Sequence, residues 1–142
     1  MKVINILQSK GVDVFAVTQD MTLKEAVDVL GEKNIGAVIV KDAGGKVTGI
    51  LSERDVVRRI RTDGPEVLSK TVAACMTPSP ITCGPDASLD EILAKMTEKR
   101  IRHLPVVDGG KLMGVISIGD VVKRKIDNAE RETAALREYI AS

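Results

Sequence analysis

Short apolar runs alternate along the chain with apolar residues spaced three and four apart, and both halves show this alternation. The runs have the length of buried strands, whereas the spacing is that of a helix with one buried face. In the first half the helical spacing comprises Leu23, Ala26, Val27 and Leu30, and in the second half Leu89, Ile92, Leu93 and Met96. The chain is therefore predicted to contain one structural unit twice.

A capping box starts each of these two helices. In such a box a hydroxyl side chain and a glutamate three residues later satisfy backbone N–H groups of the first helical turn. The boxes are Thr22-Leu23-Lys24-Glu25 and Ser88-Leu89-Asp90-Glu91. Each helix is followed by two apolar strands joined by a glycine-containing turn, and then by a second helix. Each unit is predicted to run strand, helix, strand, strand, helix.

The strands of the first unit are predicted at 12–17, 37–40 and 47–51, and those of the second at 81–82, 104–107 and 112–116. The second helices begin at Ser52 and Ser117. The first of them is predicted to bury Val56, Val57 and Ile60. A short helix is predicted at 3–10, and a linker with some helical character runs from Gly64-Pro65 to Pro78-Ser79-Pro80.

The two units align directly, 20–59 with 86–124, with one residue deleted in the hairpin turn. Two copies are too few for a solenoid, so we expect them to pack about a pseudo-two-fold axis and to bury their apolar faces together. The predicted fold class is α/β (α+β), with two β-α-β-β-α repeats and flanking N- and C-terminal helices. The predicted boundaries are 12–64 for repeat 1, 65–126 for the linker and repeat 2, and 127–142 for the C-terminal helix, all in one compact module.

The C-terminal stretch carries apolar or small residues at a heptad spacing, at Ile126, Ala129, Thr133, Leu136 and Ile140. This spacing is typical of a helix that packs along another helix. With Ala and Thr in only two heptads, the pattern is too weak to act as a strong zipper alone. We expect this helix to dock on its own module or on a partner subunit.

Composition narrows the possible functions. Of 142 residues, 21 are basic and 20 acidic, so the net charge of +1 supplies no general attraction for nucleic acid or anionic lipid. No apolar run has the length of a membrane span and the N-terminus does not resemble a signal peptide, which predicts a cytoplasmic protein. Cys75 and Cys83 are predicted to be reduced thiols, since they are too few for a zinc site or a disulfide framework.

Two further absences bear on chemistry. The chain has no Trp, one Phe and one Tyr, so aromatic stacking cannot be the main way it holds a base, and a purine would lie between aliphatic side chains. There is one His and no hydrolase or metal-cluster motif, so acid–base machinery is scarce. We predict that the protein is not an enzyme and holds no metal.

A serine and an aspartate three residues apart stand at the start of both second helices, as Ser52-x-x-Asp55 and Ser117-x-x-Asp120. The simpler interpretation is helix capping. Capping boxes usually carry Glu, however, and a short carboxylate at a strand-to-helix turn is also placed to accept two hydrogen bonds from the cis-diol of a ribose. The residues alone leave both interpretations open.

Basic residues near these turns are candidate phosphate ligands. Arg102-His103 stand where the first copy has Gly36-Ala37, and the pair supplies donors suited to phosphate. Arg54, beside Asp55, is a weaker candidate. Arg54, Arg58 and Arg61 share one helical face, for which solvent exposure is the default interpretation and nucleic-acid binding the alternative.

These motifs together resemble a tandem pair of CBS domains, often called a Bateman module. The resemblance rests on the repeated Gly-x-x-Ser-x-x-Asp, on Met76-Thr77-Pro78 and on Lys99-Arg100-Ile101-Arg102-His103-Leu104-Pro105-Val106-Val107. It implies a regulatory module that binds AMP, ADP, ATP, NAD(H) or S-adenosylmethionine in two clefts between the repeats. It also implies a homodimer that passes the signal to a separate regulated protein.

The resemblance further implies roles for individual residues. The ribose ligands would be Ser52, Asp55, Ser117 and Asp120. The adenine would lie against Val17, Thr18, Ile35, Gly36 and Ala37 for the Asp120 cleft, and against Ile81, Thr82, Ile101 and Arg102 for the Asp55 cleft. Phosphate would be held by Arg102 and His103, and by Arg54 to a lesser degree. The alternative function is a ligand-free dimerisation scaffold in which the serines and aspartates only cap helices.

Overall fold

The computed structural model describes residues 1–10 and 14–141, with the exception of the Lys10 side chain. The chain forms two compact units, one of Asp13–Thr82 and the other of Met1–Val12 with Cys83–Ser142. Each unit contains one copy of the predicted repeat, so the mixed α/β fold class with two repeats is confirmed. None of the helices in the described parts of the chain combines the length and apolar character that a bilayer crossing needs.

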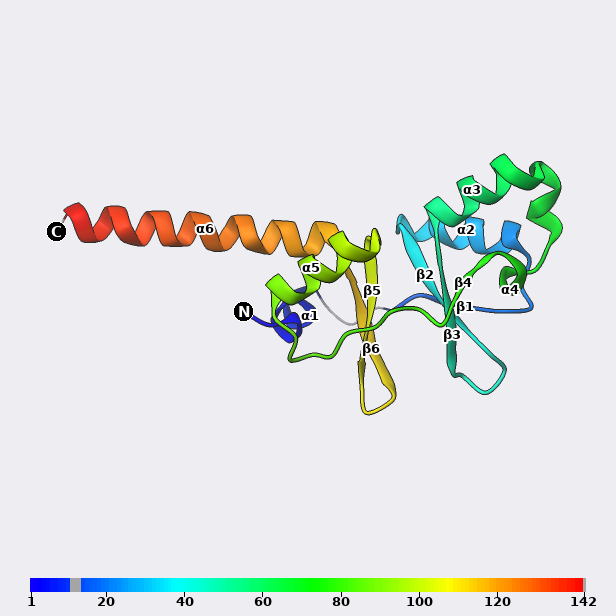
Figure 1. Ribbon diagram of the computed structural model, residues 1–142, viewed down its shortest axis with the longest axis horizontal. Helices are drawn as coiled ribbons and strands as arrows, with labels where there is room; N and C mark the ends of the chain where they lie inside the picture. The colour runs from blue at the N-terminus through cyan, green and yellow to red at the C-terminus, as the bar shows by residue number, and fades with distance from the viewer. Residues whose placement is uncertain (11–13, 142) are drawn as a thin grey trace. The chain divides into compact units, whose positions relative to one another are not determined.

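The unit of Asp13–Thr82 is built on a four-stranded sheet (Figure 1). Its strands, in sheet order, are β1 (Ala16–Thr18), β2 (Ala37–Lys41), β3 (Val47–Ser52) and β4 (Thr77–Pro78). β1 pairs with β2 in parallel, and the other neighbours are antiparallel. The helices are α2 (Leu23–Lys33), α3 (Glu53–Asp63), the 3₁₀ helix η1 (Pro65–Ser69) and α4 (Val72–Cys75). The linker after α3 is therefore helical in part, as predicted.

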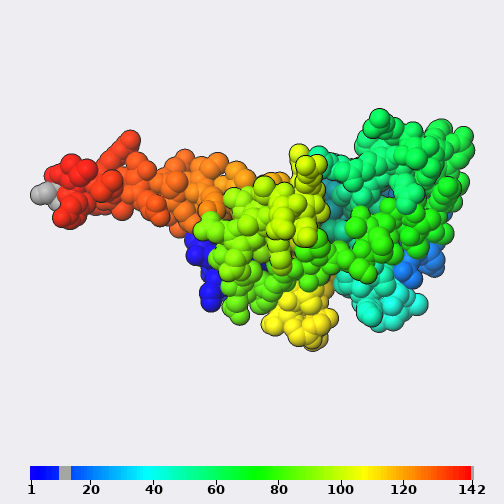
Figure 2. Space-filling view, viewed as in Figure 1, coloured from blue at the N-terminus to red at the C-terminus, as the bar shows by residue number. Residues whose placement is uncertain are grey.

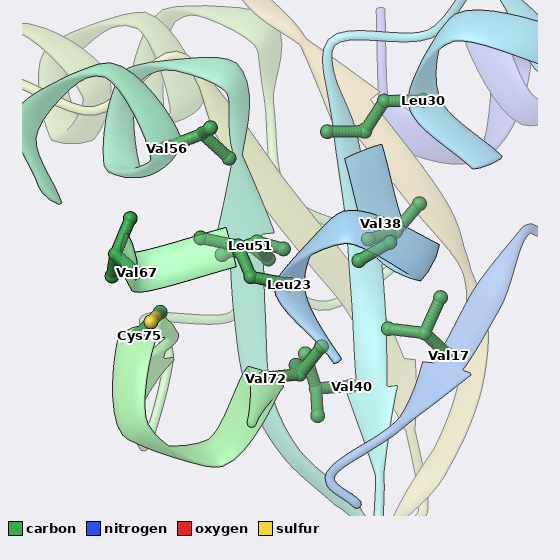
Figure 3. Close-up of a cluster of buried hydrophobic side chains, with 11 residues drawn as sticks. Val17, Leu23, Leu30, Val38, Val40, Leu51, Val56, Val67, Val72 and Cys75 are labelled. Carbon is green, nitrogen blue, oxygen red and sulfur yellow. The ribbon is translucent and has the colours of Figure 1, made fainter. Parts of the chain in front are cut away.

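The core of this unit lies between the sheet and these helices (Figure 3). It is formed by buried aliphatic side chains and one thiol, namely Val17, Leu23, Ala26, Leu30, Val38, Val40, Leu51, Val56, Val67, Val72 and Cys75. Three of the four residues in the predicted stripe of α2 are among them, and Val27 lies half-buried at the edge. The stripe prediction for α2 is confirmed.

In the other unit a two-stranded antiparallel sheet is flanked by helices. Its elements are α1 (Val3–Lys10), α5 (Leu89–Lys99), β5 (His103–Asp108), β6 (Lys111–Ser117) and α6 (Ile118–Ala141). The predicted strand end at 81–82 is wrong, because neither residue is in a strand. An isolated parallel bridge between Cys83 and Val106 stands there instead. The Cys83 N–H donates to the Pro105 carbonyl at 3.0 Å, and this single bridge is too short to extend the sheet.

Capping fixes where the first helix of each repeat begins and ends. The Thr22 hydroxyl accepts the Glu25 N–H at 3.2 Å, and the Ser88 hydroxyl accepts the Glu91 N–H at 3.1 Å. Asn34 and Arg100 then end the helices in the left-handed conformation, with φ of 52° and 54°. The predicted hydroxyl N-caps, Thr22 and Ser88, are therefore confirmed as the starts of α2 and α5.

The short helix before each repeat packs in the unit that contains the other repeat. In the unit of α5, the Val3 N–H donates to the Ala87 carbonyl at 2.9 Å. In the unit of α2, the Val72 N–H donates to the Met21 carbonyl at 2.8 Å. Helix α4 therefore packs before α2 in the same way as α1 packs before α5. The two helices are thus equivalent parts of the internal repeat.

Two prediction errors concern the second helices. Val56 is buried, but Val57 is 65% exposed and Ile60 38% exposed, so the predicted inner face of α3 is too wide. Adjacent helical residues point about 100° apart, so a stripe through residue 56 does not include residue 57. The expectation that the C-terminal helix docks on its own module is also wrong, because residues 129–141 of α6 are exposed. The other expected arrangement, docking on a partner subunit, stays a prediction.

Replacing Gly49 with Ala is expected to lower the free energy of unfolding by roughly 1–3 kcal/mol, the usual cost of overpacking. A Cβ at Gly49 would lie 2.4 Å from Met76 Sδ and 2.9 Å from the Thr77 carbonyl oxygen, which belongs to the backbone. At the equivalent Gly114 the nearest atom is 2.8 Å away, at the flexible end of Leu7. Gly114→Ala should therefore cost less, as urea titration of both variants would show. An equal loss would contradict the role of the α4–β4 backbone.

Candidate functional site

The Ser52-x-x-Asp55 turn lies where β3 runs into α3. The Ser52 hydroxyl accepts the Asp55 N–H at 3.2 Å, and Asp55 Oδ2 accepts the Ser52 N–H at 2.9 Å and the Ser52 hydroxyl at 3.1 Å. The two residues therefore form a complete capping box. This box fixes the position of the carboxylate at the mouth of the turn, on a half-buried residue.

The second turn, Ser117-x-x-Asp120, repeats this geometry where β6 runs into α6. Asp120 Oδ2 accepts the Ser117 N–H at 2.9 Å, and the Ser117 hydroxyl accepts the Asp120 N–H at 3.1 Å. The capping interpretation is thus confirmed at both turns. Capping uses only part of the hydrogen-bonding capacity of each carboxylate, because its two oxygens together have about four lone-pair sites.

Thr77 is an additional neighbour of Asp55. Its hydroxyl donates to Asp55 Oδ1 at 3.3 Å, from the short strand β4 that pairs with β3 beside Gly49 and Ile50. Thr77 belongs to the Met76-Thr77-Pro78 motif and was not among the predicted site residues. No local signal in the sequence indicates this contact, because it joins residues 22 positions apart.

The residues opposite each turn differ sharply in charge. Strand register places Ala37 opposite Ser52, and the Glu53 N–H donates to the Gly36 carbonyl at 3.0 Å. In the other unit the same register places His103 opposite Ser117. There the Ile118 N–H donates to the Arg102 carbonyl at 2.8 Å. Each unit thus brings its Ser-x-x-Asp turn together with the strand entry that the sequence singled out.

The basic candidates therefore stand at different chain positions relative to the two turns. Beside Asp55, the cation is Arg54, an exposed residue in the first turn of α3. The aligned position in the second copy is Gly119, and there Arg102 and His103 supply the basic groups from the start of β5. The turn at Asp120 has two basic groups at the strand entry, whereas the turn at Asp55 has small uncharged ones.

The other predicted adenine contacts are spread over both units. Val17 is 3% exposed and belongs to the core, so its side chain is not available to a ligand. The Thr18 hydroxyl donates to Asp20 Oδ1 at 2.6 Å, and this bond lowers the pKa of the Asp20 carboxyl. Ile35 is half-buried beside the core cluster, and Ile81, Thr82 and Ile101 lie on the partly exposed surface.

Two arginines position the short helices near the turns. Arg59 Nη2 donates to the Ala74 carbonyl in α4 at 2.9 Å. At the aligned position, Arg124 Nη2 donates to the Asn5 carbonyl at 3.2 Å and to the Ser9 hydroxyl at 2.8 Å, both in α1. Arg58 and Arg61, which also lie on α3, are exposed. Their exposure agrees with a solvated face.

Neither a metal-binding cluster nor a reactive thiol was found within the described residues. No group of three or more His, Cys, Asp and Glu side chains among them could hold a metal ion. Cys75 and Cys83 are free and buried. Burial raises the pKa of the Cys83 thiol to about 11, so it is protonated and a poor nucleophile at neutral pH.

Comparison with known proteins shows where this arrangement occurs. The family model described as the CBS domain matches twice, at residues 7–62 and 72–127. The mitochondrial CBS domain-containing protein CBSX3 of Arabidopsis thaliana is 35% identical over 127 residues. That alignment covers 87% of this chain but 62% of CBSX3, so this chain spans less than two thirds of that protein.

Solved structures agree with the family match. The CBS-domain containing protein ATU1752 from Agrobacterium tumefaciens is 41% identical, with a TM-score of 0.85 over 87% of this chain and 92% of that one. The CBS domain pair of protein MJ0100, solved in complex with 5-methylthioadenosine and S-adenosyl-L-methionine, is 25% identical, with a TM-score of 0.76 over 87% and 98% of the two chains. The repeated family match and these structures show that the chain belongs to the CBS domain family and carries two copies of the domain.

Proposed function

We propose that this CBS-domain pair is a regulatory module that binds an adenosine-containing ligand. The observation that carries the proposal is the pair of Ser-x-x-Asp turns, each holding a carboxylate by its own backbone at a strand-to-helix junction. Such a carboxylate can accept the two hydroxyls of a ribose without moving, because the capping box has already fixed its rotamer. The adenosine derivatives in the related MJ0100 structure support this ligand class.

The ribose ligands in this proposal are Asp55 with Ser52 and Asp120 with Ser117. Thr77, which donates to Asp55 Oδ1, would either assist at the first turn or be displaced by a ribose hydroxyl. The adenine contacts implied by the sequence, in particular Gly36, Ala37 and Ile101, stay predictions. A ligand that uses backbone and aliphatic groups suits a chain with one Phe, one Tyr and no Trp.

The charge difference between the turns supports different ligands at each. His103 stands opposite Ser117 and the neighbouring Arg102 carbonyl accepts the Ile118 N–H, so phosphate-bearing ligands such as AMP, ADP, ATP or NAD(H) are favoured at the Asp120 turn. Ala37 stands opposite Ser52 and the Gly36 carbonyl accepts the Glu53 N–H, so both residues lie beside the Asp55 turn, although the resemblance assigns them to the Asp120 cleft. At these two positions a ligand without phosphate meets no charged side chain. Arg54 is the cation that would extend phosphate binding to the Asp55 turn.

Ligand-dependent thermal stabilisation tests the proposed function. Ligand-stripped protein would be heated with AMP, ADP, ATP, NAD(H), S-adenosylmethionine or 5-methylthioadenosine. Guanosine monophosphate is the control for the base, because it carries the same ribose and phosphate as AMP. A ligand present at about 100 times its dissociation constant adds roughly 2.7 kcal/mol of stability, which is a clear shift in Tm. No shift with any adenosine compound, or an equal shift with guanosine monophosphate, would refute the proposal.

The scaffold alternative has one observation in its favour. The capping hydrogen bonds at both turns are already complete, so Ser52, Asp55, Ser117 and Asp120 have a structural role without any ligand. A scaffold predicts that no adenosine compound stabilises the protein, whereas the regulatory module predicts that at least one does. The regulated protein in the proposal would respond to the bound and unbound forms of the module.

A further inference from the structure

The C-terminal half of helix α6 has no cover from the unit to which it belongs. Ile126, Leu136 and Ile140 are 53%, 59% and 74% exposed, and all of residues 129–141 are exposed. This part of the helix, orange to red, stands clear of its unit in Figure 2. A helical segment without tertiary contacts gains little stability in water, so a partner surface would stabilise this one.

Five exposed residues at heptad spacing, called here the α6 seam, lie along one side of this helix, namely Ile126, Ala129, Thr133, Leu136 and Ile140. Their spacing of three and four residues alternates as at the a and d positions of a coiled coil. Thr133 does not bring an unsatisfied donor into this stripe, because its hydroxyl donates to the Ala129 carbonyl at 2.9 Å. The seam can therefore be buried without the cost of an unpaired polar group.

The charges beside the seam indicate which partner and which orientation fit. In a parallel, in-register pair of α6 helices, Glu132 at a g position faces Arg137 at the following e position of the second copy. The two-fold symmetry of the pair makes this contact twice. An antiparallel pair that keeps all five seam residues together would instead set Glu130 against Glu130 and Glu132 against Glu132.

Lys125 is the one flanking charge already engaged within its own unit. It forms an ion pair with Asp90, which also lowers the pKa of that carboxyl through the hydrogen bond from Lys125. In the parallel pair, Lys125 would also face Glu130 of the second copy, but its bond to Asp90 already occupies it. The parallel orientation is therefore favoured by Glu132 and Arg137. Neither of these side chains forms an ion pair within the described part of its own chain.

We propose that α6 forms a parallel, in-register two-stranded coiled coil with α6 of a second copy of this chain, through the α6 seam. This interface is independent of the proposed ligand binding. It joins the two copies through a helix that follows the second CBS domain, and the short seam with Ala and Thr at its centre makes the association moderate and concentration-dependent. The exposed stripe and its flanking charges together favour self-association over an unpaired helix.

Charge reversal in the full-length chain tests the pairing. Glu132→Arg alone and Arg137→Glu alone each turn both cross-pairs from attractive to repulsive, and each should weaken self-association roughly tenfold in analytical ultracentrifugation. Mixing the two variants should restore wild-type association, because every cross-pair in the mixed dimer is again Arg with Glu. Failure of the mixture to recover, with both variants folded by circular dichroism, would overturn the proposal.

A cysteine pair tests the register and orientation directly. Leu136→Cys should form an intermolecular disulfide under mild oxidation, because equivalent d positions meet in a parallel, in-register pair. Glu138→Cys, on the opposite side of α6, is the matched control and should not, and the native thiols are buried. No disulfide at residue 136, or equal cross-linking at 138, would overturn the proposal. A tight complex with a different protein in place of self-association would do so too.

Discussion

Replacing Asp120 with Asn is expected to weaken binding of a phosphate-bearing adenosine ligand roughly tenfold to a hundredfold while the fold is retained. A hydrogen bond to a charged group contributes about 1.5–3 kcal/mol, and the neutral amide presents an N–H where the ribose hydroxyl needs an acceptor. The amide oxygen can still accept the Ser117 N–H, which Asp120 Oδ2 now accepts at 2.9 Å. The measurement is isothermal titration calorimetry with the ligand that gives the largest thermal shift.

A matched control separates ligand binding from capping in this test. Glu91→Gln makes the same charge-neutralising change in the capping box of α5, in the same unit, at a residue with no proposed ligand role. It should leave ligand affinity unchanged. Asp55→Asn should remove the other binding event. If Asp120→Asn and Glu91→Gln reduced affinity equally, the effect would be structural and the assignment of Asp120 to ribose would fail.

The second large effect is expected from the core. Leu51→Ala should lower the free energy of unfolding by about 2–5 kcal/mol, because removing a fully buried side chain leaves a cavity. Leu51 is 0% exposed in β3, and Ile116, at the aligned position in β6, is also 0% exposed, so Ile116→Ala should cost a similar amount. Since the chain has no Trp, the measurement is urea unfolding followed by far-UV circular dichroism.

Val57→Ala is the control for these core variants. Val57 is 65% exposed on α3, so its truncation should change the free energy of unfolding by less than about 0.5 kcal/mol. This variant also distinguishes the observed burial of α3 from the wider inner face that its sequence predicts. A loss of several kcal/mol at Val57 would mean that α3 is packed differently from the structure described above.

Local signals made the first helix of each repeat predictable. The hydroxyl at Thr22 or Ser88 and the apolar stripe both act within one or two helical turns, and both have the predicted role in α2 and α5. The Ser-x-x-Asp turns were predictable for the same reason. Their capping bonds join residues only three positions apart.

Contacts between distant segments were not predictable in this way. The equivalence of α1 and α4 is hidden because Val3–Lys10 and Val72–Cys75 share little beyond apolar positions, and it emerges only from their matching bonds to Ala87 and Met21. The Thr77 contact with Asp55 spans 22 residues and depends on β4 pairing with β3. Such contacts follow from tertiary packing, which outweighs local preference at segment ends.

The exchange of short helices between repeats has a consequence for synthesis of the chain. Helix α1 is made before the rest of its unit, yet the Ala87 carbonyl and the Arg124 side chain that bind it are translated much later. Its apolar face must therefore remain unburied on the ribosome while the whole unit of Asp13–Thr82 is completed. The unit that contains α1 closes only through contacts more than 80 residues apart in sequence. It is thus expected to form after its companion in the growing chain.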